Sequence, residues 1–166
     1  SFPPAAPPPP WITLSLSLAP MRRSVWEEHP FYTDAWASED TEWGHWAREN
    51  DRRIAYVADA VVMHSHNYTL RQIYGRRFVE GEADAFIYRD NESILTCGAA
   101  YFRSLARDMA VSLRAGDIAC ALTSPARLAV YHWAHYRGHR LGARRLRHGD
   151  ADAATGQSIV LSRYEP

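Results

Sequence analysis

The stretch Ile54-Ala55-Tyr56-Val57, followed after Ala58-Asp59 by Ala60-Val61-Val62-Met63-His64, decides the predicted fold class. Both runs are short and contain β-branched residues, which favour strands. The Ala58-Asp59 pair that separates them is typical of a turn. Helical patterns dominate the rest of the chain. We therefore predict an α/β fold that is mostly helical and has a few short strands.

Helices are predicted before these runs. The sequence Ser38-Glu39-Asp40 is favourable at a helix N-terminus, and Trp43 and Trp46 then lie on one helical face. This helix should end near residue 50. Upstream, residues 22–29 suit a short helix that Pro30 ends, because the residue before proline is disfavoured in the helical region.

Longer helices are predicted after the runs. The apolar spacing indicates a helix over residues 69–88 and another over 97–115, with Gly116 as a natural stop. Ser124-Pro125 combines an N-cap residue with proline at the first helical position. We therefore expect the last helix to begin there and to end near Arg145.

The end of the last helix is strongly basic. Cations at this position complement the helix dipole, which fits an ordinary solvated helix end. The same residues would also suit contact with an anionic membrane surface. Both interpretations stay open for the group Arg137, His139, Arg140, Arg144, Arg145, Arg147 and His148.

Composition limits the class of protein. The chain has 166 residues, of which 46% are hydrophobic, enough for one ordinary core. Its 19 basic residues, all arginine, balance 19 acidic ones, which argues against a nucleic-acid-coating surface. Cys97 and Cys120 form no C-x-x-C pair, so a reducing compartment fits. No apolar stretch reaches the roughly 18 to 20 residues that a membrane span needs.

The chain is expected to have four parts. Residues 1–20 begin with six prolines within ten positions, which predicts a disordered or poorly packed segment or a Pro-rich ligand for a partner. Residues 21–90 form the first folded part, residues 91–149 a helical extension, and residues 150–166 a tail.

Two groups of residues suggest chemistry. Glu39 and Asp40 are predicted at a helix N-terminus, where the dipole stabilises a carboxylate that could act as a base; helix capping is the structural alternative. His64 and His66 are two apart, so their rings share a face if the segment is extended. Imidazole suits Mn²⁺ or Zn²⁺, but a metal would need further ligands.

An ordered succession of motifs resembles the C-terminal half of a bacterial family 2 glycosyltransferase over about residues 21–85. The matching runs are Arg22-Arg23-Ser24-Val25-Trp26-Glu27-Glu28-His29-Pro30-Phe31, Ala37-Ser38-Glu39-Asp40-Thr41-Glu42-Trp43, Arg53-Ile54-Ala55-Tyr56 and Asp59-Ala60-Val61-Val62-Met63-His64-Ser65-His66-Asn67-Tyr68. On this basis residues 21–90 would be the acceptor-side half of a GT-A domain.

The resemblance implies an inverting transfer of sugar from a nucleotide-sugar donor to a saccharide or lipid-linked acceptor. Asp40, beside Glu39, would be the general base, and Mn²⁺ or Mg²⁺ would offset charge on the diphosphate. His64 is the first choice as a metal ligand and His66 the second. Cell-envelope polysaccharide synthesis in the cytoplasm, peripheral to the inner face of the cytoplasmic membrane, is the implied setting.

Further residues are candidates for substrate binding. Trp36 could stack on a sugar ring or lie in the core. Arg76 and Arg77 could bind phosphate through their guanidinium groups or could simply form a solvated helix face. The family's processive members carry Gln-x-x-Arg-Trp near here, whereas this chain reads Gln72-Ile73-Tyr74-Gly75-Arg76, so a processive synthase is unsupported.

The family's nucleotide-binding half, with its Asp-x-Asp metal site, has no counterpart in this sequence. We therefore expect the chain to be a fragment, inactive alone and lacking part of its metal-ligand set. Two alternatives stay open. One is a non-catalytic helical module that binds a partner or a membrane surface. The other is a metal hydrolase built on Glu39, Asp40 and the histidines.

Overall fold

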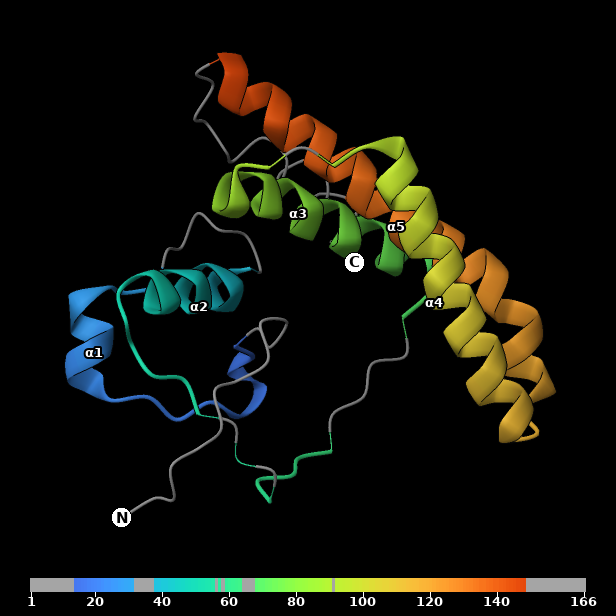
Figure 1. The fold of residues 1–166 in the computed structure, drawn as a ribbon, viewed down its shortest axis with the longest axis horizontal. Coiled ribbons are helices and arrows are strands. Elements are labelled where there is room, and N and C mark those ends of the chain that lie inside the picture. The colour runs from blue at the N-terminus through green and yellow to red at the C-terminus, as the bar shows by residue number, and fades with distance from the viewer. Residues whose placement is uncertain are drawn as a thin grey trace. The chain divides into compact units, whose positions relative to one another are not determined.

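The computed structural model describes residues 14–31, 38–55, 57, 59–63, 68–90 and 92–148 (Figure 1). The chain divides into two compact units, Ser1–Asn67 and Tyr68–Pro166. The elements are the 3₁₀ helix η1 (Leu16–Leu18) and the α-helices α1 (Arg23–Glu28), α2 (Glu39–Glu49), α3 (Leu70–Tyr88), α4 (Ile94–Arg114) and α5 (Ile118–His148).

The predicted α/β class is wrong, and so is the GT-A-like arrangement that the resemblance implied. Every regular element within the described ranges is a helix. Where they are described, the two runs predicted as strands have no regular structure, and they leave Val61 81% and Met63 99% exposed. A strand needs a neighbouring strand to bond its backbone groups, and β-branched composition alone provides none.

The first unit is held together by aromatic side chains around α2. Trp43 is buried, and its indole Nε1 donates a hydrogen bond to the carbonyl of His29, 2.8 Å away. The His29 ring also stacks on Trp46, with 4.5 Å between ring centroids. The chain after α1 is thus fixed to one face of α2, the face that the Trp43 and Trp46 spacing predicted.

The helices of the second unit begin and end at local sequence signals. Thr69 and Gln72 form a capping box at the start of α3, and Ser93 and Thr96 form another at the start of α4. Gly116 follows α4 with φ of 71°, a left-handed conformation that glycine adopts without strain. The predicted stop at Gly116 is therefore confirmed.

The predicted start of the last helix at Ser124-Pro125 is wrong. α5 begins at Ile118 and contains Pro125 in its interior. Its first turn is capped by Asp117, whose Oδ1 accepts a hydrogen bond from the backbone N–H of Cys120 at 2.9 Å. The Asp117 cap lies one residue after the Gly116 turn, so α4 and α5 form a tight helical hairpin.

The core of the second unit is the crossing of α3 with the C-terminal part of α5 (Figure 1). The two backbones come very close, because a Cβ on Gly81 would overlap the carbonyl of His135 and a Cβ on Gly138 would overlap that of Phe78. Ala85 and Ala134 are completely buried nearby. Small residues thus replace the usual large apolar side chains at this helix crossing.

Candidate functional site

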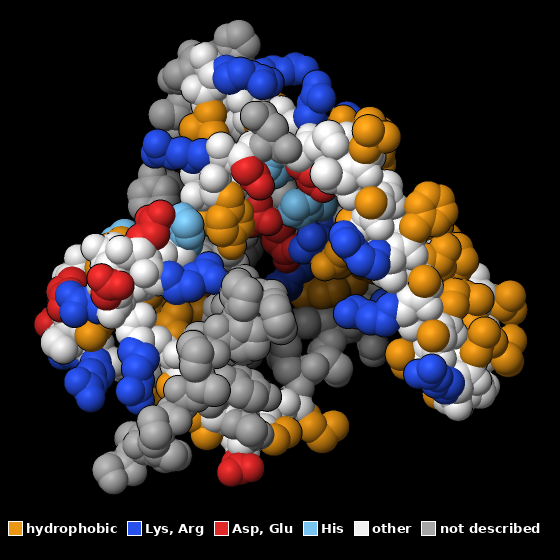
Figure 2. Space-filling view, viewed as in Figure 1, with side chains coloured by type: hydrophobic (Ala, Val, Ile, Leu, Met, Phe, Trp, Pro, Cys, Tyr) orange, Lys and Arg blue, Asp and Glu red, His pale blue; other side chains and the backbone are white. Residues whose placement is uncertain are grey.

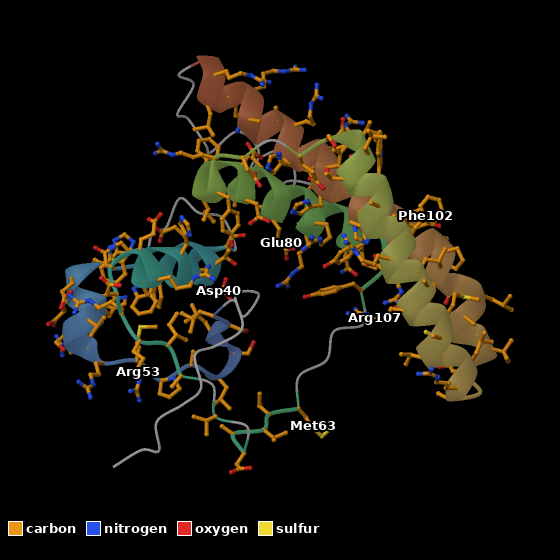
Figure 3. The ribbon with its side chains drawn as sticks, viewed as in Figure 1. Asp40, Arg53, Met63, Glu80, Phe102 and Arg107 are labelled. Carbon is orange, nitrogen blue, oxygen red and sulfur yellow. The ribbon has the colours of Figure 1, made fainter. Side chains whose placement is uncertain are left out.

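The two predicted catalytic carboxylates lie in the first turn of α2. Asp40 and Glu39 are both half-buried, and Asp40 Oδ1 accepts a hydrogen bond from the backbone N–H of Thr41 at 2.8 Å (Figure 3). Ser38, although it precedes the helix, makes no side-chain capping bond. The groups that complement the positive end of the α2 dipole are therefore these carboxylates, and not a Ser38 cap.

Three further predicted site residues, Trp36, His64 and His66, lie outside the described residues. Within the part of the chain that the structure describes, no group of three or more His, Cys, Asp or Glu side chains is arranged to hold a metal ion.

Arg76 and Arg77, predicted to bind substrate, are on α3 in the second unit and share one partner. Arg76 Nε bonds Glu80 Oε1 at 3.0 Å, and Arg77 also pairs with Glu80. Partial burial lowers the pKa of Arg76, but Glu80 and Tyr68 outweigh it and raise the pKa overall. Arg77 in addition lies over the ring of Tyr131, 4.0 Å from its centroid.

These contacts distinguish the two arginines. The Arg76 side chain is 48% exposed, whereas that of Arg77 is mostly covered and its Nε has no hydrogen-bond partner among the described residues. Arg77 therefore serves the packing of α3 against α5, and Arg76 is the better candidate for contact with an anionic ligand.

A polar pocket that the sequence analysis missed lies between the end of α3 and α5. Its volume is about 300 Å³. His135 in its lining contacts two carboxylates: Nε2 bonds Asp84 Oδ2 at 3.0 Å, and Nδ1 bonds Glu92 Oε2 at 3.1 Å. One turn later, His139 Nε2 bonds Asp90 Oδ1 at 2.7 Å. Tyr88 and Thr96 complete the lining.

The electrostatics of this pocket favour a protonated His135. Burial lowers the pKa of His135, but its bonds to Asp84 and Glu92 outweigh burial and raise the pKa to about 9. The imidazolium therefore balances charge between two carboxylates. His139 is buried, and its Nδ1 has no hydrogen-bond partner among the described residues.

The basic end of α5 is only partly solvated, which corrects the prediction of an ordinary solvated helix end. His139 and Arg145 are buried, and Arg145 forms an ion pair with completely buried Glu82 of α3. Burial raises the pKa of Glu82, and the charge of Arg145 opposes that rise. Arg137, Arg140, Arg144 and Arg147 are exposed, as the prediction required.

The pocket did carry a sequence signal. His135 and His139 are four residues apart, so they lie on one face of any helix that contains both. Asp84 lies on the face of α3 that meets these histidines. Patterns in a single sequence, however, cannot show that two residues about 50 positions apart are in contact. The same limit concealed Glu82 as the partner of Arg145.

Comparison with known proteins gives no match among family models, curated proteins or solved structures. None of the helices described here has both the length and the apolar character required to cross a membrane.

Proposed function

We propose that the chain provides the acceptor side of an inverting glycosyltransferase, with Asp40 as general base. The observation that carries this proposal is the position of Asp40 in the first turn of α2, half-exposed, within the ordered motifs that resemble family 2 glycosyltransferases. The correction of the fold class leaves this local arrangement intact, because the Glu-Asp pair still begins a helix.

The proposed reaction starts with proton transfer. Asp40 takes the proton of an acceptor hydroxyl as the hydroxyl oxygen attacks the anomeric carbon of a nucleotide sugar. The bond between that carbon and the diphosphate oxygen breaks, and the nucleoside diphosphate leaves with the electron pair. Attack opposite the leaving group inverts the anomeric centre. Asp40 then releases its proton to water.

The partial exposure of Asp40 in the first turn of α2 supports this role, since an acceptor hydroxyl can reach its carboxylate. Mn²⁺ or Mg²⁺, where bound, would neutralise charge on the diphosphate. His64 and His66, the ligands proposed for it, lie outside the described residues. We propose lipid-linked or saccharide acceptors at the inner face of the cytoplasmic membrane as the setting.

Nucleoside diphosphate release tests the base assignment. The chain is assayed together with the nucleotide-binding half of a family 2 glycosyltransferase, a panel of nucleotide sugars and extracted acceptors. Asp40→Asn should lower turnover by about 10²-fold or more, because a base contributes 10² to 10⁴. The matched control Glu39→Gln removes a neighbouring carboxylate and should change turnover only a few-fold.

Two results would reject the proposal. One is unchanged turnover in Asp40→Asn. The other is absence of turnover in the unsubstituted chain with every donor. If Asp40→Asn lowers only the unfolding temperature, Asp40 is a helix-capping residue, and the alternative of a module without chemistry gains support.

A further inference from the structure

The outer side of the α4–α5 hairpin carries large apolar side chains in contact with solvent. On α4, Leu95 is 80% exposed and Phe102 is 68% exposed; on α5, Leu122 is 77% exposed. Figure 2 shows hydrophobic side chains gathered along this hairpin. Large apolar side chains exposed together on a folded protein mark a surface that binds a partner.

The orientation of α4 explains this exposure. Its side toward α5 combines small polar residues with Tyr101: Cys97 and Ser112 are buried, Ser104 bonds His132 at 3.0 Å, and the Tyr101 hydroxyl bonds the Pro125 carbonyl at 3.5 Å. The apolar stripe of α4, Leu95, Phe102 and Leu113, lies on another side of the helix and remains uncovered. Phe102 and Arg107 extend from different sides of α4 (Figure 3).

α5 presents a matching exposed face that changes character along its length. At helical spacing the face carries first Ile118, Leu122, Ala129 and Trp133, and then Arg137, Arg140, Arg144 and Arg147. Aromatic rings occupy the boundary, where Arg137 lies 6.0 Å from the centroid of the Trp133 ring and Arg140 6.0 Å from that of Tyr136. The face thus passes from apolar through aromatic to basic.

A groove joins the two helices. Its volume is about 520 Å³, and its lining includes Ile94 and Tyr101 of α4 with Ala129 and Trp133 of α5. The apolar stripe of α5 therefore continues into α4, and the hairpin presents one extended surface.

The charge of the hairpin is very different from that of the whole chain. Residues 94–148 contain nine arginines and only two acidic residues, Asp108 and Asp117, although the chain as a whole is neutral. Arg145 is buried against Glu82, and the other eight arginines are exposed. Asp108 is also paired, with Arg127 at 2.7 Å. The surface therefore fits a partner that is both apolar and anionic.

We propose that the α4–α5 hairpin binds the surface of an anionic lipid bilayer. Its apolar stripes would enter the boundary between headgroups and acyl chains, and the arginines would contact lipid phosphates. Two copies of the hairpin would repel each other through their arginines, and a nucleic acid would leave most of the apolar stripes uncovered, because most of its contacts are made through phosphate and sugar. This inference does not depend on the proposed glycosyltransferase activity.

Co-sedimentation with vesicles tests the proposal. The whole chain is mixed with vesicles of phosphatidylcholine and phosphatidylglycerol, or of phosphatidylcholine alone, at low and high salt. We expect binding to the anionic vesicles that weakens with salt. Phe102→Ser and Leu122→Ser should each weaken binding about tenfold, since each removes an inserted side chain. The matched control Val111→Ser removes an exposed apolar residue on the opposite side of α4 and should leave binding unchanged.

Circular dichroism confirms that each variant is helical before the comparison. No binding to anionic vesicles would overturn the proposal. Equal binding to both vesicle types, or equal losses in Val111→Ser and Phe102→Ser, would do the same. Sedimentation equilibrium without lipid tests whether a second copy of the chain binds this surface instead. A dimer that Phe102→Ser dissociates would assign the surface to self-association and refute the proposal of bilayer binding.

Discussion

Glu82 of α3 and Arg145 of α5 form an ion pair in the interior of the second unit, where the Glu82 side chain is completely buried. Removing one partner strands the other charge in the core, so Glu82→Ala should lower the free energy of unfolding by about 3–5 kcal/mol. The double variant Glu82→Met with Arg145→Met should lose much less, because apolar groups of similar size can replace a buried pair.

Denaturant unfolding of the single and double variants completes this cycle, with exposed Arg144→Met as a control of little effect. Equal losses in the double variant and in Glu82→Ala would show that packing volume, and not the stranded charge, controls stability here.

The α3–α5 crossing should be intolerant of a methyl group at Gly138. A Cβ there would overlap the Phe78 carbonyl, which is backbone and cannot move without shifting α3. Gly138→Ala should therefore destabilise by at least about 2 kcal/mol. In the control Gly98→Ala, the added Cβ meets nothing within 4 Å, and the change should stabilise α4 by about 0.5–1 kcal/mol. Thermal unfolding that ranks the two variants in the reverse order would contradict the close crossing.

The protonated His135 predicts a specific dependence of stability on pH. Because its pKa is raised in the folded state to about 9, its contribution is complete below the unfolded value near 6.5 and is lost as pH rises toward 9. The difference between these two pKa values corresponds to a loss of roughly 3 kcal/mol in the free energy of unfolding. Unfolding measured from pH 6 to 10 should therefore show a decline that His135→Gln lacks. Parallel curves for the two proteins would refute the charged imidazolium.

The Trp43 hydrogen bond should stabilise the first unit. Trp43→Phe keeps an aromatic ring but leaves the His29 carbonyl without its indole donor, so a loss of about 1–2 kcal/mol is expected. Trp26→Phe, at a less buried position, is the control and should cost less. If both variants lose the same stability in denaturant, the bond to His29 contributes nothing beyond ring packing.

Local signals in the sequence predicted most helices, and the errors have identifiable causes. Thr69 with Gln72 and the glycine at 116 act within a few residues, so the helix limits that they set were readable. The run 60–63 looked like a strand because β-branched residues favour one, yet a strand exists only with a partner. Ser124-Pro125 is typical of a helix start, but Asp117 already caps α5, and the helix continues through Pro125.

The site was less readable than the fold. Asp40 could be placed at a helix start because its neighbours decide that position. The pairing of His135 with Asp84 and of Arg145 with Glu82 depends on the close crossing of α3 and α5. The sequence signal for that crossing is a set of glycines: Gly138 and Gly142 are four residues apart on α5, and Gly81 is on α3. A search for stripes of large apolar residues does not detect it.

Hydrogen exchange of the whole chain, measured with and without anionic vesicles, tests most directly the claim that the α4–α5 hairpin is a membrane-binding surface. We predict slower exchange in peptides from α4 and the first half of α5 when phosphatidylglycerol vesicles are present, with no change in peptides from α2. Unchanged exchange in α4 and α5, or slowing confined to α2, would contradict the claim.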